Sequence, residues 1–137
     1  MSTDQEQHNI ATTHAYFAAV DAFDPEAVAL HLALDVIQTE FPNIMTPTRK
    51  ERSREDILTG AREAGFFLDA QRTEVTRMLA RDEEVAVEAV WTGVLKFELG
   101  PLKAGETLRI YTASFFTFRD GKIAAQRTYS CVDAPTP

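Results

Sequence analysis

The sequence predicts an α+β fold in which helices come first along the chain and a mainly antiparallel sheet follows. In the first half, apolar residues recur three or four positions apart, which is helical spacing. From Arg72 onward the period changes to two, as in strands with one buried face. Asp120-Gly121 separates the last two such segments and favours a tight hairpin turn. Helices gathered before strands indicate a sheet that curls over the helices, rather than a parallel sheet built from βαβ units.

Two helices are expected before the first strand. Residues 1–9 have no apolar periodicity and are expected to form a loose tail. The first helix is predicted over residues 10–22. The second begins with Asp24 as its N-cap and Pro25 at its first helical position, and it is expected to end near Leu34.

A short strand and a third helix come next. The stretch VIQTEFPN, residues 36–43, alternates like a strand until Pro42 ends it. Ser53 is followed three positions later by Asp56, which is the pattern of a capping box. The third helix is therefore predicted to begin there and to end around residues 67–69.

The second half of the chain predicts four longer strands. The final residues read as a second loose tail, so one domain is expected over residues 10–132, with flexible tails at 1–9 and 133–137. The four strands are predicted over residues 72–80, 85–99, 107–119 and 122–132.

Composition excludes several classes of partner. The chain has 137 residues, of which 45% are hydrophobic, enough for a single core. Its 14 basic and 21 acidic residues give a net charge of -7, and no basic run would follow a phosphate backbone, so nucleic acid is not an expected partner. No apolar stretch approaches the roughly 20 residues of a membrane-spanning helix, and the N-terminus is polar and acidic. A cytoplasmic protein with no membrane partner is expected.

The usual signatures of metal and cofactor chemistry are missing from the sequence. Cys131 is the single cysteine, and His8, His14 and His31 lack the spacing of a metal site. The sequence has no glycine-rich phosphate loop and no nucleophile elbow. We therefore expect neither a metal nor a cofactor.

Polar residues interrupt apolar strand faces in three places. Thr112 and Ser114 share a face with Phe116, either as core hydroxyls bonded to backbone or as the lining of a cavity. Trp91, on the preceding strand, is either core or a platform for a ligand. In the last strand neither face is plainly apolar, which favours one face on a pocket and the other at a subunit interface or in solvent. The pocket set there is Gln126, Thr128 and Ser130, alternating with Ala125, Arg127 and Tyr129.

Three segments resemble a known superfamily. YFAAVDAFDPEAVALHLALDVIQTEFP resembles the helix-helix-strand opening of ketosteroid isomerases, and VAVEAVWTG and FRDGKI look like strand and hairpin segments of the same group. Over residues 10–132 the chain is thus similar to the nuclear transport factor 2-like superfamily, which includes ketosteroid isomerases and SnoaL-like polyketide cyclases. The resemblance implies a cone-shaped, cystatin-like fold with three N-terminal helices in the concave face of a strongly curved sheet. The fold hosts enzymes and non-catalytic modules, so it does not by itself imply an activity.

The resemblance also implies site residues. Tyr16 falls where the isomerases keep an oxyanion-hole tyrosine, and Glu40 falls at or beside their aspartate base. A shift of one residue would put Phe41 at the base position instead. Ser114 replaces the protonated aspartic acid that serves as the second oxyanion donor, and a hydroxyl is the weaker donor. In the cyclases an acid acts late in the sheet, where this chain has Ser130, with an aspartate just beyond.

Dehydratase and epoxide hydrolase relatives fit the sequence less well. The dehydratases depend on pocket histidines, which these strands lack. The hydrolases need an Asp-Arg-Asp group in the cavity, and Arg127 has no acidic pair at matching parity.

The resulting hypothesis is proton abstraction next to a carbonyl of a small hydrophobic ligand. Glu40 is the predicted base, with Tyr16 and Ser114 stabilising the oxyanion, and burial among apolar side chains would make the carboxylate a stronger base. The rival hypothesis is a binding or interaction module in which Glu40 is a solvated rim residue. The predicted lining of the cavity is Phe41, Phe66, Phe67, Val87, Trp91, Thr112, Phe116, Gln126, Thr128 and Ser130.

The outer face of the sheet is predicted to form a homodimer. Relatives commonly pair through that face, and aromatic residues with arginine suit an interface. The residues expected there are Tyr111, Phe115, Arg127 and Tyr129.

Overall fold

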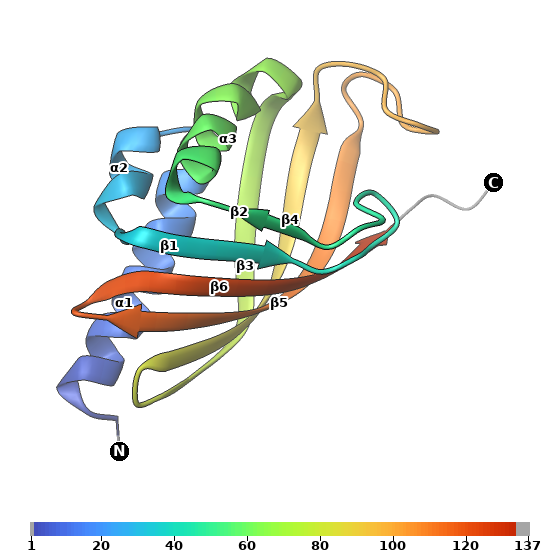
Figure 1. Ribbon diagram of the computed structural model, residues 1–137. Helices are drawn as coiled ribbons and strands as arrows, with labels where there is room; N and C mark the ends of the chain where they lie inside the picture. The colour runs from blue at the N-terminus through green and yellow to red at the C-terminus, as the bar shows by residue number, and fades with distance from the viewer. Residues whose placement is uncertain (1, 134–137) are drawn as a thin grey trace.

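The computed structural model describes residues 2–133, which form three helices and six strands (Figure 1). The helices lead, and four long strands end the chain, as the change of period predicts. The elements are α1 (Asp4–Asp21), α2 (Pro25–Leu30), β1 (Leu32–Glu40), β2 (Lys50–Arg52), α3 (Arg54–Phe67), β3 (Leu68–Arg81), β4 (Glu84–Leu95), β5 (Thr107–Arg119) and β6 (Lys122–Asp133).

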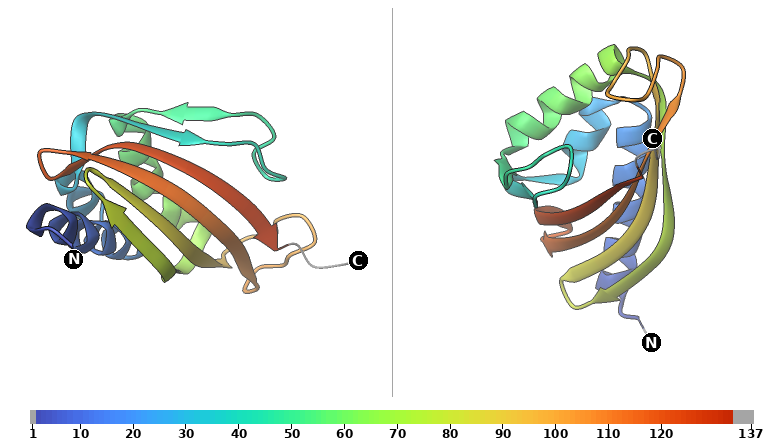
Figure 2. Two further views of the ribbon diagram at one scale, coloured as in Figure 1. Left: turned by 90° about the horizontal axis from the view of Figure 1, so that it is seen from below. Right: turned by 90° about the vertical axis from the view of Figure 1, so that its right-hand side faces the viewer.

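One sheet of order β2-β1-β6-β5-β4-β3 curves around the helices (Figures 1 and 2). Every neighbouring pair is antiparallel except β1 and β6, which run parallel. The helices lie in the concave side of the sheet, with α1 against β3 and β4 and α3 against β1 and β3. This is the predicted α+β cone.

The N-terminal segment is helical from Asp4, so the prediction of a loose tail over residues 1–9 is wrong there. A capping box closes the start of α1: the Thr3 hydroxyl accepts from the Glu6 amide, and the Glu6 carboxylate accepts from the Thr3 amide. The early turns escaped detection because their buried residues are polar, Asn9, Thr12 and Thr13, and give no apolar period. At the other end Asp133 belongs to β6, and the rest of the predicted tail lies outside the described residues.

Other boundaries differ in ways that matter for the site. Helix α2 ends at Leu30 rather than near Leu34, because the Ile123 amide donates to the His31 carbonyl and the chain joins the sheet. Strand β4 ends at Leu95 rather than Leu99. Strand β2 was not expected: it lies in the loop 43–53 and pairs with the end of β1, Glu40 opposite Lys50.

The apolar core has two parts. The larger lies between the helices and the sheet, and the smaller joins Leu95, Leu102 and Leu108 near the far end of the long strands. Among the described residues, no helix has the length and apolarity needed to cross a membrane. The buried residues of the larger part are Tyr16, Ala19, Val28, Leu32, Val36, Ile57, Leu58, Val85, Phe116, Phe118 and Ile123.

Two polar contacts fix the end of α1 on the sheet. The carboxylate of Asp21 accepts hydrogen bonds from the Thr73 amide at 2.7 Å and from its hydroxyl at 2.8 Å. Gln71 donates to the Val20 carbonyl at 2.7 Å. Because β3 is an edge strand, the Asp21 carboxylate occupies a backbone amide of its free edge, that of Thr73, and both contacts hold the end of α1 on β3.

Candidate functional site

A cavity of about 370 Å³ lies between α1 and the concave face of the sheet. Its walls combine aromatic and aliphatic side chains with a small set of polar groups, which is the usual composition of a small-molecule site. The lining residues are Tyr16, Phe17, Val20, Gln38, Glu40, Arg52, Thr73, Trp91, Ile110, Thr112, Ser114, Phe116, Gln126, Thr128 and Ser130.

A second hollow of about 500 Å³ continues from the first toward α3. The helix contributes Ile57, Gly60, Ala61 and Ala64, and a Cβ added to Gly60 would meet nothing within 4 Å. The two hollows meet at the residues that both share, which are Tyr16, Val20, Gln38, Arg52 and Trp91.

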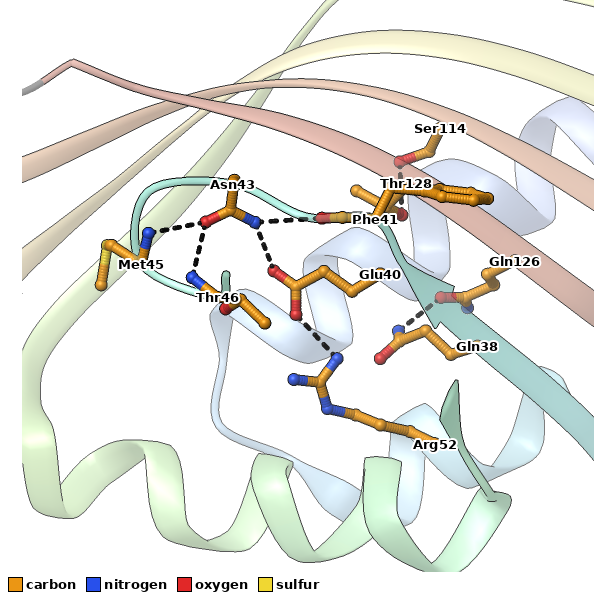
Figure 3. A network of polar contacts seen from close by, with 10 residues as sticks. All are labelled: Gln38, Glu40, Phe41, Asn43, Met45, Thr46, Arg52, Ser114, Gln126 and Thr128. Carbon is orange, nitrogen blue, oxygen red and sulfur yellow. Dashed lines mark hydrogen bonds and ion pairs between the residues drawn. The ribbon is translucent and has the colours of Figure 1, made fainter. Parts of the chain in front are cut away.

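Glu40, and not Phe41, faces the cavity (Figure 3). Successive strand residues point to opposite sides, so Glu40 follows Gln38 onto the inner face. Phe41 lies on the other side and stacks on Tyr129, with ring centroids 4.3 Å apart and planes 6° apart. The predicted role of Phe41 in lining the cavity is therefore wrong.

The carboxylate of Glu40 is held by two neighbours (Figure 3). Arg52 forms an ion pair with Glu40 Oε1 at 2.8 Å, and Asn43 Nδ2 donates to Glu40 Oε2 at 3.2 Å. Asn43 is itself fixed, because its Oδ1 accepts from the amides of Met45 and Thr46. Glu40 therefore lies in a polar corner of the cavity and not among apolar side chains alone.

Arg52 and Asn43 are the functional candidates that the sequence did not reveal. Arg52 reaches Glu40 only because β2 pairs with the end of β1. A three-residue strand is too short to show a period of two. The only available signal was the capping box at Ser53, which fixes where α3 begins and so where β2 must end.

Tyr16 projects from α1 into the cavity and is almost fully buried. Its ring contacts Phe17 and Phe116, each at 5.8 Å between centroids. Burial raises the pKa of Tyr16, and the neighbouring amide of Gln126 acts in the opposite direction. The phenol is consequently protonated at neutral pH and available as a hydrogen-bond donor.

The two hydroxyls of β5 have different partners. Ser114 forms a hydrogen bond of 2.9 Å with the Thr128 hydroxyl on β6, and Thr112 donates to the Ala89 carbonyl at 3.4 Å. Thr112 thus fits the backbone-bonded interpretation while also lining the cavity. In the Ser114–Thr128 pair one hydroxyl uses its proton on the other, so one proton is free for a ligand.

Glutamines from neighbouring strands form another pair. Gln38 and Gln126 lie opposite each other in the β1–β6 register, and Gln38 Nε2 donates to Gln126 Oε1 at 2.6 Å. Trp91 is positioned by Gln71, which accepts from the indole nitrogen at 2.9 Å. Its ring lies across Gly93, where an added Cβ would collide with it.

Three further residues of the predicted lining lie elsewhere. Phe66 and Phe67 are 68% and 62% exposed at the end of α3. The second hollow is lined by Ala61 and Ala64 of the helix and by Leu68, the first residue of β3, and by neither phenylalanine. Val87 is buried in the sheet outside the cavity lining and borders a different hollow.

The described residues contain no group of three or more His, Cys, Asp or Glu side chains that could hold a metal ion. A curled sheet of six strands around three helices, enclosing a largely apolar cavity, is the architecture of nuclear transport factor 2-like proteins. The model of the SnoaL-like domain matches residues 13–126, and the chain belongs to this family. A sequence search of curated proteins found no match.

Solved structures share this fold at low identity. IdmH of Streptomyces antibioticus, a candidate polyketide cyclase, has a TM-score of 0.75 at 20% identity over 89% of this chain and 91% of its own. A candidate ketosteroid isomerase from Kribbella flavida has a TM-score of 0.66 at 23% identity over 96% and 84%. An LEH-like epoxide hydrolase from M. tuberculosis has 0.70 at 20% over 91% and 84%.

The outer face of the sheet carries an aromatic group. Tyr111, Phe115 and Tyr129 are all partly exposed, and Phe115 meets Tyr129 edge-on at 6.3 Å between centroids. The Arg127 guanidinium lies 5.5 Å from the Phe115 centroid. The predicted residues thus lie together on this face, and the dimer itself stays a prediction.

Proposed function

We propose that this protein is a cofactor-free isomerase or cyclase that removes a proton next to a carbonyl of a small hydrophobic, steroid- or polyketide-like substrate. The observation that carries the proposal is that Glu40 and Tyr16 line the same, otherwise largely apolar cavity. A base and an uncharged hydrogen-bond donor facing one ligand are the minimum that enolisation needs.

In this mechanism the carboxylate of Glu40 accepts the proton. The C–H bond next to the carbonyl breaks, and its electron pair moves onto the carbonyl oxygen. Arg52 and Asn43 each bind one oxygen of this carboxylate and together orient it. Tyr16, protonated because burial raises its pKa, donates to the developing oxyanion. The Ser114–Thr128 pair offers a further hydroxyl proton.

The similarity to solved structures supports the class of chemistry. Among the structural neighbours are a candidate polyketide cyclase and a candidate ketosteroid isomerase. Both names imply reactions on carbonyl compounds. At 20% and 23% identity they share a fold, so the residues of this cavity carry the proposal.

The second candidate function is a non-catalytic module that binds a small hydrophobic molecule. One observation favours it: both oxygens of Glu40 are already engaged, by Arg52 and Asn43. A carboxylate whose two oxygens are both bonded to protein donors has fewer lone pairs free to meet a ligand.

The distinguishing experiment measures exchange of α protons in deuterated water. Cyclic enones and 1,3-diketones are incubated with the protein, and deuterium uptake is followed by mass spectrometry. We expect catalysed exchange that falls about 100-fold or more in Glu40→Gln, the usual worth of a general base. Glu51→Gln is the matched control, because Glu51 pairs with Arg49 at 2.7 Å on the exposed side of β2.

Two outcomes would overturn the catalytic proposal. Unchanged exchange in Glu40→Gln would remove Glu40 from the mechanism. Saturable binding without any exchange would favour the binding module. Binding is readily followed because Trp91, the single tryptophan, lines both hollows.

A further inference from the structure

A buried donor in the cavity has no partner at full hydrogen-bond geometry. Gln126 is 2% exposed, and its Nε2 meets the distance and angle of a hydrogen bond with no described residue. Among residues 2–133, the other buried side-chain atoms without a hydrogen-bond partner belong to Asn9 and Arg54, neither of which lines the cavity. An amide nitrogen carries two donors, and a buried donor without an acceptor is unfavourable.

The direction of this nitrogen is fixed by its surroundings (Figure 3). Gln38 holds the Gln126 oxygen from the adjacent strand, so the nitrogen occupies the opposite corner of the amide. Hydrogen bonding by the same side chain to the Tyr16 hydroxyl opposes the effect of burial on the pKa of Tyr16, so the two groups are neighbours. Two uncharged donors, the Tyr16 hydroxyl and the Gln126 amide, therefore adjoin each other in one cavity.

We propose that Gln126 is the anchor for the ligand's carbonyl group, with Nε2 donating a hydrogen bond to the carbonyl oxygen beside the Tyr16 hydroxyl. The inference rests on the proposed function in placing the ligand in this cavity. Gln126 would be the second hydrogen-bond donor to the oxyanion. Ser114 is a weaker donor than the carboxylic acid that the isomerases keep at its position. When the proton passes to Glu40, the negative charge develops on the oxygen held by these two donors.

The charges of the site favour a ligand whose hydrogen-bonding group is uncharged. Arg52, the cation of the cavity lining, is already paired with Glu40. Tyr16 and Gln126 carry no charge at neutral pH, and neither compensates the desolvation of a carboxylate. A ketone needs two donors and no counterion, so a neutral cyclic ketone is the ligand class that this pair fits.

Matched probes test the anchor directly. 2-Tetralone and 2-tetralol share a carbon skeleton and differ in a carbonyl against a hydroxyl, and their affinities are measured by quenching of Trp91 fluorescence and by calorimetry. Gln126→Met removes the donor at similar length. We expect wild-type protein to prefer the ketone, and the variant to lose about tenfold in ketone affinity, roughly one neutral hydrogen bond, with less than about threefold for the alcohol.

A second variant guards against loss of folding. Gln126→Glu keeps the shape of the side chain and turns the donor into an acceptor, so it should reverse the preference toward the alcohol. Gln7→Met, on the exposed face of α1, is the control for a Gln-to-Met change, and urea denaturation checks that each variant folds.

Three results would overturn the inference. The first is an equal loss of affinity for the ketone and the alcohol in Gln126→Met. The second is a wild-type preference for the alcohol that depends on Gln126, and the third is no binding of the ketone at millimolar concentration. The binding readout needs no turnover, so it separates the two proposals. If Glu40→Gln leaves exchange unchanged while Gln126 discriminates the ketone, only the proposed base fails. If the reverse holds, only the anchor fails.

Discussion

Two zones of the same inner sheet face differ in what they pack against. On β5 and β6, Phe118 and Ile123 belong to the buried core and do not line the cavity. Ser114 and Thr128 lie on the same face of the same two strands, a few residues farther from the β5–β6 turn, and they line the cavity instead. Phe118 and Ile123 form what we call the packed zone. The polar belt comprises Thr112, Ser114, Gln126, Thr128 and Ser130.

The difference shows how one curved sheet carries both a core and a site. In the packed zone, side chains meet the helices, and little of their surface remains exposed. In the belt the polar groups bond across strands, Ser114 to Thr128 and Gln126 to Gln38, and each pair has hydrogen-bonding capacity that it does not use internally. The belt therefore gives up apolar packing for hydrogen-bonding capacity, as functional sites commonly do.

The largest effect on stability is expected in the packed zone. Phe118→Ala should lower the free energy of unfolding by about 3–5 kcal/mol, because removing a fully buried ring leaves a cavity in the larger part of the core. Chemical denaturation measures it. Phe115→Ala, 39% exposed on the outer face, is the matched control and should cost much less. Equal losses in the two variants would mean that the packed zone is not the main source of stability.

A smaller effect is expected in the belt. Ser114→Ala should change the free energy of unfolding by about 1 kcal/mol, the net worth of one hydrogen bond, while lowering α-proton exchange by roughly tenfold. Denaturation and the deuterium assay measure the two quantities on the same sample. A stability loss as large as that of Phe118→Ala, with exchange intact, would make Ser114 a core residue rather than part of the site.

The smallest expected effect is on the pH dependence of stability, and it arises beside the packed zone. Burial first, and the charge of Lys122 second, lower the pKa of His31 from its usual 6.5. The unfolded chain therefore takes up the proton first, so stability should fall as the pH drops below about 6.5. His31→Gln should flatten urea-denaturation stability between about pH 7 and 5, and His14→Gln, on exposed α1 surface, is the control.

At lower pH, protonation of the Asp35 carboxylate should lower the stability further. A hydrogen bond from Arg119 holds the pKa of Asp35 below its usual 3.8. Its contribution to stability is present above that value and is lost as the pH falls through the lower, folded-state pKa. A rise in urea-denaturation stability as the pH falls from about 6.5 to 5 would contradict the assignment of His31, and a rise as it falls below about 4 would contradict that of Asp35.

Local pattern predicted the elements where burial is apolar and failed where it is not. The capping residues Asp24 and Ser53 start α2 and α3 as expected, because capping depends on neighbours within three positions. The start of α1 was missed because Asn9, Thr12 and Thr13 are buried without an apolar period. Strand β2 was missed because its three residues pair through a loop, which no local pattern encodes.

For the candidate site too, local pattern predicted some residues and could not place others. Alternation within each strand grouped Gln126, Thr128 and Ser130 on one face, and the family resemblance added Tyr16 and Glu40. Neither could place Phe66 and Phe67, because the inward face of α3 is set by how the helix packs on the sheet.

The sequence by itself determined that Glu40 and Phe41 point to opposite faces, since strand geometry alternates side chains whatever the fold. Only the tertiary structure decided that Glu40 is the inner one, through the pairing that sets Gln38 against Gln126 and Glu40 against Thr128. It also brought Arg52 within 2.8 Å of that carboxylate and left the Gln126 nitrogen without an acceptor. These contacts join residues 12 to 88 positions apart, and nothing in the local sequence encodes a distance between them.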